Sequence, residues 1–530
     1  MPFLSFLSEN ARRAPEAPAL VERNYLRGDG RPYRAVLTHG QLQAVTCGIG
    51  GALGRLAEKG GHVALLMDNC LELLPAFFGI LASGSVAVML NTHCPVQELV
   101  QQLARADSAF LIYGAQNASL ARQILELSPT LHSAYVLPSS EKAGADRNLV
   151  GCNLLALAKE TEANQTDVPE FSDDTLAVIY FSSGSTGEKK AILLDHGSLR
   201  FSSQTERSAH GQTAADTFLC IPPFYHAGAL AHTLGGLCVG AKTVLLRGIQ
   251  PNMILDTIAN EKCTIAWMPV PCAVDILDQL QQDRERPDTS SLRLVHMGAQ
   301  PIPQALVQRW KSQFPHAAFE ITYGLTEAGG PNVLHSGTDG RTPAGAVGKP
   351  GDGWSCRIVD AQGRPQPDGR AGELVIRGRG VMRGYYKDPA ATAGVLSPEG
   401  WLHTGDIARR DGTGCYYILD RRKNVIIRGG ENLYPAEIEA FLQGLPGIAE
   451  VTVVAMPERR LGEVPVCVVR PKEGFPCTEG AMLAAFQVLP RSWRPVRCFL
   501  CDIPHLPSGK PDRQQLLQFL RKMWQSPQAL

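Results

Sequence analysis

The sequence predicts an α/β protein built on parallel β-sheets. Helix-like and strand-like hydrophobic patterns alternate up to residue 400. This alternation is typical of parallel strands covered by helices. Beyond Gly345 the sequence becomes glycine-rich and strand-heavy with short turns, and the residues after 420 have the pattern of a small α+β unit. Because a chain of 530 residues is too long for one hydrophobic core, at least two domains are expected.

Hydrophobic periodicity and turn residues place the individual elements. The helix expected first is amphipathic, and Gly60-Gly61 then turns the chain into a strand. A later helix is expected to carry Pro303 in its first turn, where proline is tolerated. The expected helices are at residues 41–56, 73–82, 98–105 and 303–313, and the expected strands are at 63–67, 86–90, 110–113, 292–296 and 372–378.

Residues 73–90 carry no charge and approach the length of a membrane span. Pro75 and the break Ser83-Gly84-Ser85 favour a different interpretation, in which a core helix ends at Ala82 and a buried strand follows. We therefore expect no transmembrane segment. The N-terminus also lacks a basic region followed by a long apolar stretch, so no signal peptide is expected and a soluble, cytoplasmic protein is predicted.

Composition excludes several classes of partner. Lys+Arg and Asp+Glu balance at 51 each, so no global field would recruit nucleic acid or an acidic membrane. The 14 cysteines are scattered singly, which favours free buried thiols in a reducing compartment. Cys498-Phe-Leu-Cys501 is the only C-x-x-C, and it lies in a strand-like run without a second pair, so zinc is not expected there.

The stretch Tyr180-Phe-Ser-Ser-Gly-Ser-Thr-Gly-Glu-Lys-Lys-Ala191 is the strongest functional signal. An uncharged run at 176–181 opens into a loop of small hydroxyl residues and glycines, followed by two lysines. Backbone N–H groups of such a loop can surround a polyanion, and the lysines add positive charge. The loop therefore predicts phosphate binding, with ATP as the simplest ligand. It is not a P-loop, because G-x-x-x-x-G-K-[ST] has no match in the chain.

Further motifs follow this loop in a fixed order along nearly the whole chain. They are Pro223-Phe-Tyr-His-Ala-Gly228, Tyr323-Gly-Leu-Thr-Glu327, Gly372-Glu-Leu with Val381-Met-Arg-Gly-Tyr385, Trp401-Leu-His-Thr-Gly-Asp406, Asp420-Arg421, Gly429-Gly-Glu-Asn-Leu-Tyr-Pro435 and Pro507-Ser-Gly-Lys510. With these motifs the chain resembles the adenylate-forming superfamily of acyl-CoA synthetases, firefly luciferases and peptide-synthetase adenylation domains. The resemblance implies a large N-terminal domain of parallel α/β sheets with a β-barrel-like subdomain, and a small mobile α+β C-terminal domain. The domain ranges expected from it are 1–420 and 421–530.

The resemblance also implies how the ATP site is built. The loop residues would hold the β- and γ-phosphates, with Thr186 also expected to be catalytic, and these residues are Ser182, Ser183, Gly184, Ser185, Thr186, Gly187 and Lys190. In the next motif the ring of Tyr323 would stack on adenine between Thr322 and Gly324, and Thr326 would contact the α-phosphate. Glu327 would bind Mg²⁺, whose preference for oxygen ligands suits a carboxylate. The adenine and the acyl pocket would also be lined by Gly298, Ala299 and Gln300, and the ribose hydroxyls would bind Asp406 with Arg421 nearby.

Lys510 is implied as the catalytic lysine that holds the substrate carboxylate against the α-phosphate. The resemblance makes Lys423 the hinge about which the C-terminal domain rotates between the two half-reactions. Gly429 and Gly430 would line the tunnel for the CoA thiol. His226 would gate the carbonyl end of the acyl pocket.

Three positions depart from the family pattern. Lys189 stands where the loop usually has proline, and Ala191 stands where it has glycine. Asn424 replaces an aspartate that commonly follows the hinge, which keeps the size of the side chain but removes its charge. We expect Ala191 to be harmless unless the site needs a positive φ.

An ATP-dependent acid–CoA ligase is the expected function, with ATP, Mg²⁺ and CoA as cofactors and a small carboxylic acid as substrate. One alternative is an acyl-AMP ligase that loads an acyl carrier protein, and another is a non-catalytic nucleotide-binding homologue. The acid stays open, although an aryl or medium-chain acid is favoured over a very long chain. The acyl pocket is expected near His226, Ala227, Ala229, Leu230, residues 267–271 and residues 298–300, with His232 and Thr233 following. The sequence does not indicate the oligomeric state, and a homodimer is considered only because it is the commonest arrangement of oligomeric proteins.

Overall fold

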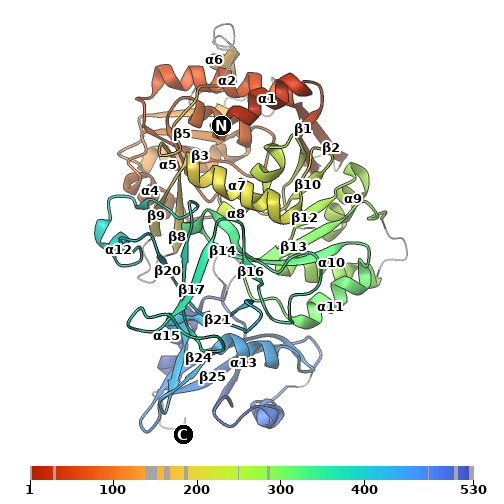
Figure 1. Cartoon of the computed structure of the whole chain (residues 1–530), viewed down its shortest axis with the longest axis vertical. Coiled ribbons are helices and arrows are strands. Elements are labelled where there is room, and N and C mark those ends of the chain that lie inside the picture. Colours follow the sequence, from red (N-terminus) through yellow and green to blue (C-terminus); the bar gives the residue numbers. More distant parts are fainter. Residues whose placement is uncertain are drawn as a thin grey trace. The chain divides into compact units, whose positions relative to one another are not determined.

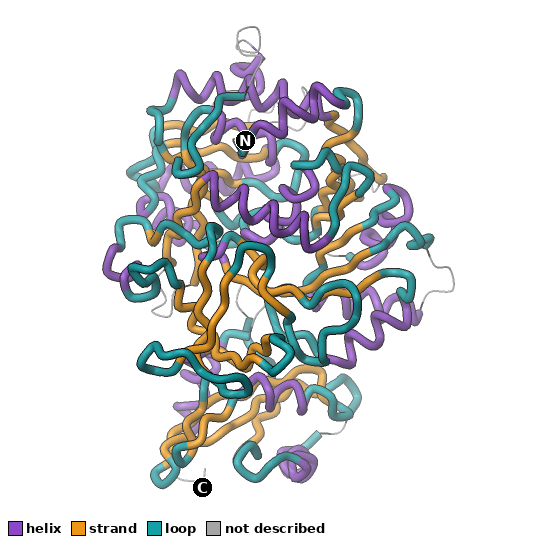
Figure 2. Tube along the Cα trace, in the orientation of Figure 1, coloured by secondary structure: helices purple, strands orange, loops and turns teal. Residues whose placement is uncertain are grey.

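The computed structural model describes residues 3–27, 31–137, 152–159, 168–183, 189–248, 250–282, 287–475, 477–505 and 511–524 (Figure 1). Contacts between Cα atoms divide the chain into two compact units. The first unit consists of Met1–Cys356 and Ile376–Leu402, and the second consists of Arg357–Val375 and His403–Leu530. Helices and strands alternate along much of the first unit, as the sequence predicts for an α/β protein. Figure 2 shows the helices in purple and the strands in orange.

Within the described residues of the first unit, one large sheet has the strand order β16-β15-β14-β13-β12-β10-β11-β1-β2. Its middle strands, from β14 to β1, pair in parallel, and antiparallel strands complete both edges. The strands are β1 Pro18–Arg27, β2 Arg31–Thr38, β10 Thr217–Cys220, β11 Lys242–Leu246, β12 Ile265–Trp267, β13 Leu294–Gly298, β14 Ala318–Leu325, β15 Gly330–His335 and β16 Lys349–Pro350.

The other large sheet has the order β19-β9-β8-β4-β3-β5-β6-β7 among the described residues. In this order, every neighbouring pair from β8 to β7 is parallel. Strand β9 pairs with β8 in antiparallel fashion, and β19 pairs with β9 in the same way. The strands are β3 His62–Leu66, β4 Val86–Met89, β5 Phe110–Gly114, β6 Ser133–Leu137, β7 Cys152–Asn153, β8 Leu176–Ser183, β9 Lys189–Asp195 and β19 Gly384–Tyr385.

Helices of the first unit cover these sheets and also separate them. They are α1 Ser5–Arg13, α2 His39–Leu56, α3 Leu73–Ala82, α4 Val96–Arg105, α5 Ala118–Leu127, α6 Leu154–Lys159, α7 His196–His210, α8 Ala227–Leu237, α9 Pro251–Glu261, α10 Val270–Gln282, α11 Gln304–Gln313 and α12 Pro389–Ala393, with short 3₁₀ turns at Ala115–Asn117 and at Thr326–Ala328, labelled η4. Helix α7 packs on β8 and β9 of one sheet and on β15 of the other, and α8 packs on α7, β10, β11 and β15 (Figure 1). Helices α7 and α8 therefore form a layer between the two sheets.

The second unit contains shorter, mostly antiparallel elements. A four-stranded sheet in the order β17-β18-β20-β21 corresponds to the expected small β subdomain, and a second sheet has the order β23-β22-β25-β24 with β26 added to β25. These elements are β17 Ser355–Val359, β18 Gly372–Arg377, β20 Leu402–Arg410, β21 Tyr416–Arg421, η5 Arg422–Asn424, β22 Ile426–Arg428, β23 Glu431–Leu433, α13 Pro435–Leu442, β24 Ile448–Glu458, β25 Gly462–Pro471, α14 Glu479–Ala485, η6 Phe486–Val488, β26 Cys498–Leu500 and α15 Arg513–Trp524. The functional division of the chain at residue 420 stays a prediction.

Most expected elements are confirmed, with small shifts at their ends. Helix α2 starts at His39 because Thr38 and Gln41 form a capping box. Strand β13 begins two residues later than predicted, since the N–H of Leu292 is used in a turn to the carbonyl of Thr289. Pro303 is the N-cap of α11 rather than part of its first turn.

The uncharged run at 73–90 forms the buried helix α3 and the buried strand β4, as predicted. No helix in the described part of the chain is long and apolar enough to cross a membrane. The cysteines whose side chains are described are free, and most of them are buried.

We expect close packing between α2 and α3 to make Gly79 sensitive to substitution. A Cβ atom at Gly79 would lie 2.4 Å from Cγ2 of Ile49, so Gly79→Ala should lower the free energy of unfolding by about 1–3 kcal/mol. Gly54 on the exposed side of α2 has nothing within 4 Å of such an atom, and Gly54→Ala should be neutral or stabilising by up to about 1 kcal/mol. Chemical denaturation of both variants tests this, and equal stability of the two would contradict it.

Candidate active site

The predicted phosphate loop connects two antiparallel strands. Strand β8 ends at Ser183 and β9 begins at Lys189, and the register pairs Ser182 with Lys190. Ser182 and Lys190 are both half-buried. The predicted loop residues Gly184, Ser185, Thr186 and Gly187 lie outside the described residues. The two strands thus hold the two ends of the loop side by side.

Lys190 and the predicted metal ligand Glu327 meet through a third residue, Tyr385. The Nζ atom of Lys190 lies 4.5 Å from the centre of the Tyr385 ring, a cation–π contact. The hydroxyl of Tyr385 donates a hydrogen bond to Oε1 of Glu327 at 3.2 Å. Sequence reasoning placed Tyr385 in a motif but assigned it no role. These two contacts join three segments that are distant in the sequence.

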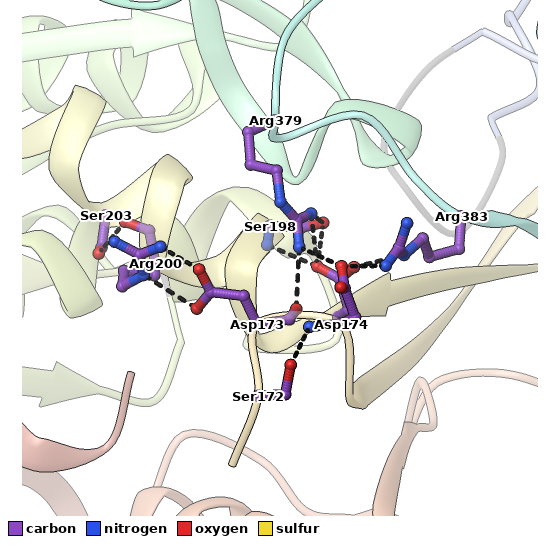
Figure 3. A network of polar contacts seen from close by, with 9 residues as sticks. Ser172, Asp173, Asp174, Ser198, Arg200, Ser203, Arg379 and Arg383 are labelled. Atoms are coloured by element: carbon purple, nitrogen blue, oxygen red, sulfur yellow. Dashed lines mark hydrogen bonds and ion pairs between the residues drawn. The ribbon is translucent and has the colours of Figure 1, made fainter. Parts of the chain in front are cut away.

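A network of ion pairs attaches the segment that carries Tyr385 to strand β9 and helix α7 (Figure 3). The buried carboxylate of Asp195 accepts from the N–H of Ser198 at 2.7 Å, which caps α7. The same carboxylate pairs with Arg379 at 2.9 Å and with Arg383 at 2.5 Å. Tyr385 then pairs with Ile192 as part of β19. The network therefore holds the backbone segment that carries Tyr385 in a defined position next to β9.

The predicted adenine segments lie on adjacent parallel strands. Gly298 on β13 is the register partner of Thr322 on β14. A Cβ atom at Gly298 would lie 2.5 Å from the carbonyl oxygen of Thr322, so a larger residue does not fit there. Ala299 follows with φ of 68°, a left-handed conformation, and Gln300 is half-buried. The structure thus brings Gly298, Ala299 and Gln300 next to the Thr322 motif.

The remainder of that motif forms the end of β14 and the turn η4. Tyr323 and Gly324 are half-exposed in β14, and Thr326 and Glu327 lie in η4. His226 is exposed and is the N-cap residue of α8. Its carbonyl accepts from the N–H of Ala229 at 3.1 Å, so the first turn of α8 fixes its backbone.

In the second unit, Asp406 and Arg421 are register partners on β20 and β21. The Nε atom of Arg421 lies 2.8 Å from Oδ1 of Asp406, and the guanidinium also donates to the carbonyl of Thr404 at 2.9 Å. Asp406 is buried, so the ion pair holds its carboxylate in one orientation. The two residues expected near the ribose are therefore brought together.

Gly429 and Gly430 form the two-residue turn of the hairpin β22–β23. Both have positive φ, 59° and 87°, as required by the type I′ turn that joins twisted strands. Lys423 is exposed in η5, between β21 and β22. Lys510 lies outside the described residues.

Each of the three residues that depart from the family pattern has a defined contact in the structure. Lys189 pairs with Glu98 of α4 at 3.4 Å, so the lysine ties the end of the phosphate loop to that helix. Ala191 is buried in β9 opposite Phe181 and does not have a positive φ, so alanine causes no backbone strain at this position.

Asn424 donates from Nδ2 to Oδ1 of Asp420 at 2.8 Å. The other oxygen of Asp420 accepts from the N–H of Ala436 at 2.7 Å, in the first turn of α13. An aspartate at 424 could not donate this bond, because an ionised carboxylate only accepts. Asn424 therefore holds the carboxylate that links the segment after β21 to α13.

Comparison with known proteins gives consistent matches over the chain. The family described as "AMP-binding enzyme" matches residues 7–386, and "AMP-binding enzyme C-terminal domain" matches residues 437–510. The 3-[(3aS,4S,7aS)-7a-methyl-1,5-dioxo-octahydro-1H-inden-4-yl]propanoyl:CoA ligase of Rhodococcus jostii is 32% identical over 86% of this chain and 88% of its own length. A feruloyl-CoA synthase of Amycolatopsis sp is 31% identical over 84% and 87%. The crystal structure of ATP-bound MatB from Rhodopseudomonas palustris superposes with a TM-score of 0.85 at 23% identity, covering 99% of this chain and 100% of that one.

We expect Asn424→Asp to destabilise the second unit. The substitution removes a hydrogen bond to a charged group and places a second carboxylate beside Asp420, which should lower the free energy of unfolding by about 1–3 kcal/mol. Asn424→Ala is the matched control, since it removes the bond without adding charge. In 1 M salt the loss from repulsion should shrink, because the Debye length falls to about 3 Å. Denaturation curves at low and high salt test this, and an Asp variant as stable as the Ala variant would contradict it.

Proposed function

The chain belongs to the AMP-binding enzyme family and is an AMP-forming acid–CoA ligase, and from this premise we propose how its residues divide the two half-reactions. In the first half-reaction the acid attacks the α-phosphate of ATP, forming acyl-AMP and releasing pyrophosphate. In the second, the CoA thiol attacks the acyl carbonyl and AMP leaves. A carboxylate is a poor electrophile because attack on it builds further negative charge, so the adenylate step must come first.

The contact series from Lys190 through Tyr385 to Glu327 is the observation that carries the proposal. It joins the end of the phosphate loop to the predicted metal ligand within one unit. In the proposal, Lys190 and the loop residues Ser182 to Gly187 hold the β- and γ-phosphates. Tyr385 orients the carboxylate of Glu327 toward the same place. The phosphates would then lie next to Lys190 and to the metal ion held by Glu327, whose positive charges offset theirs.

The residues present fit Mg²⁺. Glu327 is half-exposed and uses Oε1 to accept from Tyr385, and no partner is recorded in the described part of the chain for its other oxygen. A free carboxylate oxygen is the ligand that Mg²⁺ prefers, usually together with phosphate oxygens. When bound, the ion would offset negative charge on the phosphates. Glu327 would hold it, and Thr326 would contact the α-phosphate.

We propose that adenine binds residues of the first unit and that the ribose binds residues of the second unit. Tyr323 would stack on adenine beside Gly298, Ala299 and Gln300. The carboxylate of Asp406, held by Arg421, would accept hydrogen bonds from the ribose hydroxyls. An ionised carboxylate with two oxygens can accept from both hydroxyls at once.

Lys510 is proposed to hold the substrate carboxylate against the α-phosphate. A unit charge at 4 Å contributes about 4 kcal/mol at an effective dielectric constant of 20. Lysine suits this role as a compact charge on a flexible stem. His226, exposed at the start of α8, would gate the carbonyl end of the acid.

Rotation of the C-terminal region about Lys423 is proposed to replace Lys510 by the thiol tunnel for the second half-reaction. Gly429 and Gly430 would line the tunnel, where missing side chains allow a pantetheine arm to approach. CoA is the proposed acceptor. For the acid we propose an aryl or medium-chain carboxylic acid rather than a very long chain.

Mass spectrometry of the reaction products tests the proposed chemistry. Enzyme, ATP, Mg²⁺, CoA and a pooled panel of carboxylic acids should give AMP, pyrophosphate and one or more acyl-CoA species. Acyl-AMP without thioester would instead favour a carrier protein as acceptor. Omission of Mg²⁺ with added chelator should abolish AMP formation.

Lys510→Ala should abolish formation of the adenylate while leaving thiolysis of a supplied acyl-AMP largely intact. Removal of one preorganised charge of this kind costs roughly 10²–10³-fold in rate. The two half-reactions are measured separately, by pyrophosphate release and by thioester formation from synthetic acyl-AMP. Equal loss of both rates would remove the assigned role.

Lys423→Pro should have the opposite effect, because proline fixes φ near −65° and stiffens the proposed hinge. Adenylate formation should persist while thioester formation fails. The neighbouring variant Arg422→Ala, which leaves φ free, serves as control. Normal acyl-CoA output from Lys423→Pro would contradict the hinge.

A further inference from the structure

A cluster of buried titratable side chains lies in the layer between the two large sheets, and the proposed chemistry does not use it. We call it the histidine cluster. Its members come from α7, α8, β13, β14 and β15, and all are buried. They are Glu206, His210, His232, His296, Glu320 and His335.

The two carboxylates of the cluster are already paired with imidazoles. Glu206 Oε2 lies 2.5 Å from Nδ1 of His232 and 3.2 Å from Nδ1 of His210. Glu320 Oε2 lies 2.6 Å from Nε2 of His210, and its Oε1 lies 3.5 Å from Nδ1 of His335. Burial would lower the pKa of His210, but the carboxylates of Glu320 and Glu206 raise it. His210 therefore lies between two carboxylates, and both favour its protonated form.

His296 has no such partner. Neither of its ring nitrogens makes a hydrogen bond to any described residue, although its ring lies 4.3 Å from the rings of both His210 and His232. Burial holds the pKa of His296 and that of His232 below the usual range, so both rings are neutral at pH 7. The Nε2 of His232 and the Nε1 of Trp267 also lack hydrogen bonds within the described residues, and these two rings are 4.8 Å apart.

Such unpaired atoms need an explanation, since buried polar groups in proteins are nearly always hydrogen-bonded. Three neighbouring side chains, Trp267, His232 and His296, each carry a buried polar atom without a hydrogen bond in the described part of the chain. The simplest account is a polar group that does not belong to the chain. The position of the three side chains indicates which molecule carries it.

Trp267, His296 and Glu320 are register partners on β12, β13 and β14. Gly298 and Thr322, beside the proposed adenine and acyl site, follow two residues later on the same face, about 6.6 Å along the strands. His232 follows His226 by six residues on α8, a rise of about 9 Å. The unpaired atoms thus lie one aromatic ring or a short chain away from the proposed reacting end of the acid.

We propose that His296, His232 and Trp267 bind an uncharged hydroxyl group at the far end of the carboxylic acid. This inference rests on the proposed function and specifies its substrate class. A neutral imidazole offers one donor and one acceptor, Trp267 offers only a donor, and Nε2 of His232 is an acceptor when Nδ1–H bonds to Glu206. A hydroxyl can donate to Nε2 of His232 and accept from Trp267 and from the ring N–H of His296, so it pairs with three of the four unpaired atoms.

The two carboxylates of the cluster disfavour a second anionic group on the acid. Burial would raise the pKa values of Glu206 and Glu320, but nearby histidines lower both, so the two groups are ionised at pH 7. A carboxylate or sulfonate on the acid would be repelled by these two buried anions. A metal ion is the other chemistry considered, because His210, His232 and His296 have ring nitrogens within 4.8 Å of one another. Both nitrogens of His210 already face carboxylates, which leaves the hydroxyl as the better fit.

Matched acids that differ only at the far end test the proposal. The probes are cinnamic, 4-hydroxycinnamic and 4-carboxycinnamic acid, and hexanoic, 6-hydroxyhexanoic and hexanedioic acid, each measured by AMP formation. The hydroxy acid of at least one set should exceed both companions in kcat/KM by about 10-fold or more, as expected for a site built to hydrogen-bond a hydroxyl. AMP formation without this preference overturns the inference alone. Failure to form AMP with any acid overturns the proposed function as well.

Variants separate a hydroxyl site from a merely structural cluster. His296→Leu should lower kcat/KM for the hydroxy acid by about 10–100-fold while changing that for its unsubstituted companion by less than about 3-fold. The exposed His316, which contacts the carbonyl of Thr289, provides the control variant His316→Leu, expected to change neither. If His296→Leu does not fold, Trp267→Phe removes only one donor and should reduce the same preference. An equal loss with both acids, or a stoichiometric metal that disappears in His296→Leu, overturns the proposal.

Discussion

The first unit depends on one buried carboxylate, that of Asp195. It caps α7 and pairs with Arg379 and Arg383, two residues far away in the sequence. A buried charge without partners is costly, so the two arginines are required where they stand. By holding them, Asp195 attaches the segment 379–385 to the end of β9, and the order of contacts then leads through Tyr385 to Lys190 and Glu327. The positions of Tyr385 and of the end of β9 are thus stabilised by an ion-pair network that contains none of the residues proposed to bind ATP.

The second unit uses a carboxylate in a similar way. Asp420 accepts hydrogen bonds from Asn424 and from the first turn of α13, and so connects the chain on both sides of the proposed hinge. In the sequence, Asn424 is a departure from the family pattern that removes a charge next to the proposed hinge. In the structure it is a donor matched to its neighbour. The loss of charge at this position is therefore compatible with a well-defined local structure, because the amide donates to Asp420 a hydrogen bond that an ionised carboxylate could not make.

In our proposals, the residues that bind ATP and those that select the acid lie on the same strands. Strands β13 and β14 carry Gly298 and Thr322 at the proposed nucleotide site and, two residues earlier, His296 and Glu320 in the histidine cluster. Parallel strands in register place side chains in rows, so one row can serve the reacting end of a substrate while the next row contacts its far end. The layer of α7 and α8 closes this region from the other side and supplies Glu206, His210 and His232. Changes of substrate could then arise in the deeper row with little effect on the ATP site.

The sequence by itself determined the α/β class, the buried helix at 73–82, the buried strand that precedes the predicted phosphate loop and the order of the motifs, because periodicity, turn residues and short motifs are local properties of the chain. The family resemblance also predicted that Asp406 and Arg421 lie near each other, and the structure pairs them. Only the tertiary structure decided that Tyr385 connects Lys190 with Glu327, that Asn424 serves Asp420 and that His296 stands unpaired between His210 and His232. The residues of the histidine cluster come from five elements between residues 206 and 335. In the local sequence, each is only a single polar residue within an apolar pattern, which does not indicate a cluster. Their common location follows from strand register and helix packing, which no local pattern specifies.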